Sequence, residues 1–196
     1  MKEINQNRHE IKNSIIPFET IFNQETGTLL LNIDSSIPNL ELKKAEAIKL
    51  GLSKKEEFHF TIIGSATGDK ILKSLEGLSE VEKKKILDEI NKLLELTNWK
   101  ITLKPAIYHV QKEYNDNKTD ESGSIISEKR QSIVQIANIE GLNEFYKNLN
   151  LLLQQQFDIP FPHLTLYTTS TREDKMLRGI GIYSKIQFED LNPIKI

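Results

Sequence analysis

Two stretches of the chain place a histidine and a threonine on what is expected to be an apolar strand. His59 and Thr61 lie in EFHFTIIG, and His163 and Thr165 lie in FPHLTLYT about 100 residues later. Successive side chains of a strand point to opposite faces, so each histidine shares a face with its threonine while the apolar neighbours face the core. Each strand therefore offers an imidazole beside a hydroxyl on a rigid support.

An imidazole and a hydroxyl, present twice, suit the chemistry of a phosphodiester. Imidazole titrates near neutral pH, so one histidine can take a proton while the other gives one. The hydroxyls can hydrogen-bond phosphoryl oxygens, and in-line attack at phosphorus needs this combination of base, acid and donors. No metal or other cofactor is required. A single motif of this kind is more often structural, and it is the duplication that favours the functional interpretation.

The two motifs, HFTI and HLTL, resemble the paired His-x-Thr-x signatures of the two-histidine (2H) phosphoesterases, the LigT-like cyclic phosphodiesterase superfamily. The resemblance is strongest over residues 28–188. It implies an α+β fold with a bilobal, pseudo-two-fold arrangement, in which two antiparallel sheets form a central cleft and helices pack outside. It also implies a phosphoric diester hydrolase that acts without a metal, typically on 2′,3′-cyclic phosphates of RNA ends or small nucleotides.

The same resemblance assigns roles to the motif residues. His59 and His163 become the catalytic acid and base, and Thr61 and Thr165 become the phosphate donors. The sequence does not determine which histidine is the acid; the assignment we favour has His59 protonating the leaving oxygen and His163 activating water. Two alternatives stay open: hydrolysis of 3′,5′-linked cyclic oligonucleotide signals by the same residues, and a non-catalytic module of this fold that binds phosphate or RNA ends.

Two further residues near the second motif are candidates for substrate binding. Tyr167 is expected on the face of His163 and Thr165, where its ring would stack on a base or line the cleft wall. Arg172 follows a run of hydroxyl residues, and Ser170 with Glu173 has the spacing of a capping box. A helix starting there beside Arg172 would form an anion site.

Other sequence features favour structural roles. The stretch GSATGDK after the first motif lacks the Gly-Lys-Ser/Thr of a phosphate-binding loop and is interpreted as a turn that caps a helix. His109 has no threonine partner, and nothing at metal-ligand spacing supports a zinc site.

Hydrophobic periodicity predicts the elements that position these residues. Helix-like stripes are clearest at 80–96 and 142–157, with shorter helices at 40–50 and 69–75. The predicted strands span 28–33, 58–64, 99–110, 131–139, 163–168 and 179–188. Residues 113–123 are polar and without periodicity, which predicts a mobile hairpin loop.

Composition limits the setting in which this chemistry would take place. The 196 residues suit one bilobal domain at 28–196 preceded by an N-terminal extension at 1–27, and the chain contains no cysteine. Neither a signal peptide nor a membrane-spanning run is evident, so we expect a cytoplasmic protein without a membrane partner. With 26 basic and 28 acidic residues, the chain favours a small nucleotide or short RNA over long nucleic acid. We expect a monomer.

Overall fold

The computed structural model describes residues 10–11, 22–36, 38–119, 125–172 and 178–196, which form an α+β fold with two antiparallel sheets. The strands are β1 (Glu10–Ile11), β2 (Leu29–Ile33), β3 (Ser53–Lys54), β4 (Phe58–Ile63), β5 (Lys100–Thr119), β6 (Ile125–Glu140), β7 (His163–Ser170) and β8 (Ile194–Lys195). The helices are the 3₁₀ helix η1 (Leu40–Lys43) and the α-helices α1 (Lys44–Lys49), α2 (Ser65–Leu75), α3 (Glu80–Leu96), α4 (Leu142–Leu153) and α5 (Lys185–Asp190).

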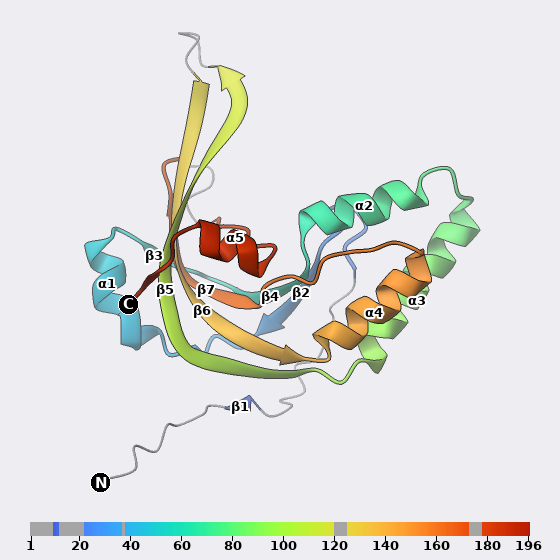
Figure 1. Ribbon diagram of the computed structural model, residues 1–196, viewed down its shortest axis with the longest axis horizontal. Coiled ribbons are helices and arrows are strands. Elements are labelled where there is room, and N and C mark those ends of the chain that lie inside the picture. Colours follow the sequence, from blue (N-terminus) through green and yellow to red (C-terminus); the bar gives the residue numbers. More distant parts are fainter. Residues whose placement is uncertain (1–9, 12–21, 37, 120–124, 173–177) are drawn as a thin grey trace.

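The larger sheet has the strand order β1-β5-β6-β7-β3, and β8 also pairs with β5. The smaller sheet consists of β2 and β4. Figure 1 shows α2, α3 and α4 gathered at one end of the fold and α1 at the other, with the far end of the β5–β6 hairpin extending beyond the body of the molecule. The two predicted motif strands are therefore β4 in the small sheet and β7 in the large one.

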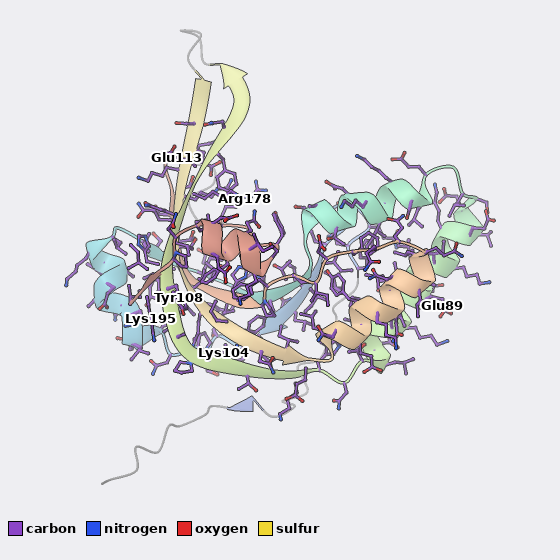
Figure 2. All side chains as sticks on the ribbon, in the orientation of Figure 1. Glu89, Lys104, Tyr108, Glu113, Arg178 and Lys195 are labelled. Atoms are coloured by element: carbon purple, nitrogen blue, oxygen red, sulfur yellow. The ribbon has the colours of Figure 1, made fainter. Side chains whose placement is uncertain are left out.

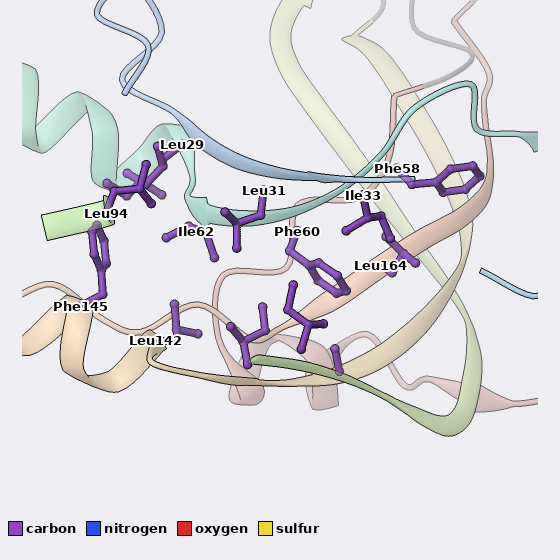
Figure 3. Close-up of a cluster of buried hydrophobic side chains, with 14 of the residues drawn as sticks. Leu29, Leu31, Ile33, Phe58, Phe60, Ile62, Leu94, Leu142, Phe145 and Leu164 are labelled. Atoms are coloured by element: carbon purple, nitrogen blue, oxygen red, sulfur yellow. The ribbon is translucent and has the colours of Figure 1, made fainter. Parts of the chain in front are cut away.

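The hydrophobic core lies between the two sheets and explains why the motif strands alternate in polarity. Phe58, Phe60 and Ile62 of β4 are buried, and His59 and Thr61 between them are only partly buried. In Figure 3, Leu31 of β2 and Phe60 and Ile62 of β4 point towards the side where Leu142 of α4 lies, within the same cluster. Each fully buried side chain of this size contributes about 1.5–3 kcal/mol to stability. This burial fixes which face of β4 remains for polar residues.

The two long predicted helices are present, and local signals account for their ends. Helix α3 coincides with the predicted 80–96 and begins with a capping box, in which Ser79 Oγ accepts from the Glu82 amide and the Glu82 carboxylate accepts from the Ser79 amide. Helix α4 ends at Leu153 rather than 157 because Gln154 takes a left-handed conformation with φ 52°.

The prediction of a mobile loop at 113–123 is wrong over its described part, because β5 continues to Thr119 and β6 begins at Ile125. Cross-strand pairs form where the sequence shows no periodicity: Glu113 lies opposite Lys129, and the Tyr114 ring lies 4.3 Å from the Arg130 guanidinium carbon. Such pairs stabilise a two-stranded ribbon without a buried apolar face. Residues 120–124 lie outside the described part.

The prediction of a strand at 179–188 is also wrong. Residues 178–183 form no regular secondary structure and pair with no strand of the described chain, and helix α5 follows. Ser184 is the N-cap of α5, since its Oγ accepts from the Gln187 amide at 3.1 Å. Ile180 and Ile182 pack on the large sheet in a second cluster of buried side chains.

The first 27 residues contribute to the body of the fold where they are described. β1 pairs with β5, and Phe22 is buried in the main core, where its amide donates to Asn91 Oδ1 at 3.1 Å. None of the helices in the described ranges has both the length and the apolar character needed to span a bilayer.

Candidate active site

Strands β4 and β7 lie side by side although they belong to different sheets, and they turn their apolar faces to the same core. Their polar faces therefore meet in a cavity of about 250 Å³. His59, Thr61, His163 and Thr165 all line it. The structure thus brings together the four motif side chains that the sequence separates by about 100 residues.

His163 is held in a defined tautomer. Its Nδ1 lies 2.9 Å from the carbonyl oxygen of Phe161, and because a carbonyl can only accept, Nδ1 carries the hydrogen. In the neutral ring the lone pair is then on Nε2. Burial lowers the pKa of His163 below its ordinary value of 6.5, and the hydrogen bond to Phe161 opposes this only in part. His163 therefore has the properties of a general base near neutral pH.

His59 has a different electrostatic environment. Burial lowers the pKa of His59, positive charge on Lys55 and on His163 adds to this, and Glu57 acts in the opposite direction. The two imidazoles are therefore close enough for the charge on one to disfavour the charge on the other. Within the described residues His59 has no hydrogen-bond partner, so its ring nitrogens are available to a ligand.

Several cavity residues escaped the sequence analysis. Lys55 and Glu57 line the cavity and precede His59 and Thr61 at the same spacing of two residues. Extending this spacing towards the N-terminus would have identified both residues. The segment 178–183 forms another wall of the cavity. A Cβ added to Gly179 would lie 3.2 Å from the Thr165 hydroxyl oxygen, so the wall passes close to that hydroxyl. The glycines at 179 and 181 were a signal for such close approach.

The expectation that Tyr167 shares the face of His163 and Thr165 is wrong. The pairing of β7 with β6 is irregular here: Val134 lies opposite Thr165, and the preceding Ile133 lies opposite Tyr167. One extra residue in β7 forms a bulge, and a shift of one residue reverses the face of every side chain beyond it. Tyr167 is consequently buried in the core, and its hydroxyl donates to the Leu40 carbonyl oxygen at 2.8 Å.

Arg172 does not line the cavity, and Arg178 does. β7 continues to Ser170, whose hydroxyl accepts from the Arg172 amide at 3.1 Å, so the strand extends through the position expected to cap a helix. The other member of the predicted capping box, Glu173, lies outside the described residues. The cation beside the second motif therefore comes from a residue further along the chain.

A buried polar network binds backbone carbonyl groups of the 178–183 wall. Arg130 and Glu128, at 6% and 1% exposure, form a bidentate ion pair, and Ser170 Oγ donates to the Glu128 carboxylate at 2.7 Å. Arg130 Nη1 donates to the Gly179 carbonyl oxygen at 3.3 Å, and the Thr168 hydroxyl shares its hydrogen between the carbonyl oxygens of Gln131 at 3.0 Å and Arg178 at 3.2 Å. Two consecutive carbonyl groups of the wall are thus fixed by buried side chains.

The described residues contain no group of three or more histidine, cysteine, aspartate or glutamate side chains arranged to hold a metal ion. His109 lies on β5 with its Nε2 3.1 Å from Gln131 Oε1, and it does not line the cavity. His109 therefore does not join His59 and His163 at the cavity.

No protein-family model, curated protein or solved structure matches this chain. The interpretation of the cavity therefore depends on its own residues.

Proposed function

We propose that this protein is a metal-independent phosphodiesterase that hydrolyses a cyclic or terminal phosphodiester, such as the 2′,3′-cyclic phosphate of an RNA end or a small nucleotide. The observation that supports the proposal most directly is that both His-x-Thr pairs line one cavity. The chance duplication of a structural motif would not require the two copies to converge. In this proposal the fold is a bilobal 2H arrangement, with β4 and β7 as the motif strands of the two lobes.

The electrostatic environments favour one assignment of roles. His163, with its Nδ1 hydrogen engaged by a carbonyl, accepts the proton of water on Nε2. His59 donates a proton to the leaving oxygen; burial and Lys55 lower its pKa, and the Glu57 carboxylate opposes them by favouring the charged form. Thr61 and Thr165 donate hydrogen bonds to the non-bridging oxygens, where negative charge accumulates in the transition state.

The reaction balances with these groups alone. A bond forms between the water oxygen and phosphorus as the bond from phosphorus to one ribose oxygen breaks. The water proton moves to His163, and the proton of His59 moves to the ribose oxygen, which leaves a ribose phosphomonoester. Proton exchange with solvent then restores both rings.

The test is hydrolysis of adenosine 2′,3′-cyclic phosphate in the presence of EDTA, with product identified by chromatography. The proposal expects turnover, and it expects that the chelator leaves the rate unchanged. A parallel reaction with a 3′,5′-cyclic dinucleotide tests the alternative function, which is hydrolysis of a 3′,5′ linkage. Phosphate or RNA-end binding without turnover of any of these substrates would instead support the non-catalytic module.

The pH dependence of the reaction follows from the pKa directions of the two histidines. The base must be neutral and the acid protonated, and in the free protein both pKa values lie below 6.5. The optimum of kcat/KM, which reports the free protein, is therefore expected on the acid side of pH 6.5. Bound phosphate favours the charged imidazole, so the alkaline limb of kcat should lie at higher pH than that of kcat/KM. Rates measured from pH 4.5 to 8.5 check this, and a kcat/KM that still rises above pH 7 would contradict it.

A further inference from the structure

All six residues of the wall segment from Arg178 to Tyr183 line the cavity. At its start, the Arg178 carbonyl oxygen is bound by Thr168, which lies beyond Thr165 on β7. At its end, the Tyr183 ring lies against Gly64, which follows β4; a Cβ added there would be 2.9 Å from Tyr183 Cε1. The two ends of the segment therefore lie against different parts of the cavity lining, one beyond Thr165 on β7 and the other beyond Thr61 at the end of β4.

One end of the cavity is cationic. Lys55 and Arg178 both line it, and both are tied to the part of β7 that follows Thr165: the Lys55 amide donates to the Leu166 carbonyl oxygen at 3.1 Å, and the Arg178 carbonyl accepts from Thr168. Within the described residues the Arg178 guanidinium has no ion-pair partner. Figure 2 labels Arg178 between the base of the β5–β6 hairpin and α2 in that view.

The other end of the wall segment is aromatic. Tyr183 is 41% exposed there, and its ring lies between Gly64 and Gly181, where a Cβ would be 2.6 Å from the Tyr183 hydroxyl oxygen. Thr61, on the strand that precedes Gly64, lines the same part of the cavity. Glu57 also lines the cavity, so the three charged side chains sum to one positive charge.

Building on the proposed function, we propose that the substrate carries a second phosphate, bound by Arg178 and Lys55 at the cationic end, while its scissile phosphodiester lies between His59 and His163. A guanidinium fits a phosphomonoester better than any uncharged group, because it can donate two parallel hydrogen bonds. The substrate class is then a 5′-phosphorylated nucleotide or the end of an oligoribonucleotide, rather than a nucleoside cyclic phosphate with a free 5′-hydroxyl.

The test compares adenosine 2′,3′-cyclic phosphate with the same nucleotide carrying a 5′-phosphate. The wild-type protein is expected to show a kcat/KM about tenfold higher for the phosphorylated nucleotide. This factor is the usual contribution of one hydrogen bond to a charged group at a partly exposed site. Arg178→Met should reduce this ratio to about one, and Arg178→Lys should restore part of it. Lys104→Met is the matched control, because it removes an exposed cation that does not line the cavity and should keep the ratio.

Calorimetry with adenosine 3′-phosphate and adenosine 3′,5′-bisphosphate separates this inference from the proposed function. The bisphosphate is expected to bind about tenfold more tightly, and Arg178→Met should abolish the difference. Tighter binding without hydrolysis of either cyclic nucleotide would support the second-phosphate site and overturn the phosphodiesterase. Hydrolysis with equal kcat/KM for the two cyclic nucleotides, or a ratio that survives Arg178→Met, would overturn the second-phosphate site and leave the phosphodiesterase standing.

Discussion

Replacing His163 by alanine should lower kcat for adenosine 2′,3′-cyclic phosphate by about 10³-fold, the usual contribution of a positioned general base. The ring is partly buried at the cavity, and its Nδ1 is held by the Phe161 carbonyl, so the variant loses an oriented base. His109→Ala is the matched control, because His109 lies on β5 outside the cavity and should leave kcat unchanged. Thermal unfolding followed by circular dichroism checks that each variant is folded.

His59→Ala should have an effect of similar size. The double variant should lose little more than either single one, because an acid and a base that act in one transition state are not independent. A folded double variant that still turns over, or a loss in His109→Ala equal to that in His163→Ala, would contradict the proposed roles.

Replacing Arg130 by methionine should lower the free energy of unfolding by about 3–5 kcal/mol, because it leaves the buried Glu128 carboxylate without its cation. The pair is almost fully buried, and Arg130 also donates to the Gly179 carbonyl oxygen. Urea denaturation of the variant measures the loss.

Two further variants separate the buried pair from a simple loss of charge. Lys129→Met, at the exposed neighbouring position on β6, should change the free energy of unfolding by less than about 0.5 kcal/mol. The double variant Glu128→Gln with Arg130→Met should be more stable than Arg130→Met alone, since it removes the uncompensated charge. Equal stability of Arg130→Met and wild type would show that the ion pair does not hold the wall.

Sequence periodicity was sufficient for the motif strands up to the point where the sheet becomes irregular. The period of two placed His59 with Thr61 and His163 with Thr165, because both strands bury their alternate residues. It failed at Tyr167 because a bulge changes the count of residues without changing their type. Nothing in the local composition distinguishes a bulged strand from a regular one, since the bulge is defined by the partner strand.

The cationic wall illustrates a second limit. Proximity to the second motif in sequence points to Arg172, whereas the residue that lines the cavity with this motif is Arg178. The buried network that fixes the Arg178 and Gly179 carbonyl groups draws on β6 and β7 together. The β5–β6 hairpin also depends on two strands together, because pairing across them stabilises residues that show no periodicity of their own.

By itself, the sequence determined the helices with strong apolar stripes, the faces of the two motif strands, and the pair of imidazoles and hydroxyls on which the proposed chemistry depends. These are local properties, because side-chain direction within a strand or helix follows from backbone geometry. Only the tertiary structure decided that the two faces meet in one cavity, that Tyr167 turns into the core, and that Arg178 joins the site. Those outcomes depend on contacts between segments far apart in the chain, and no local pattern encodes which segments will pack together.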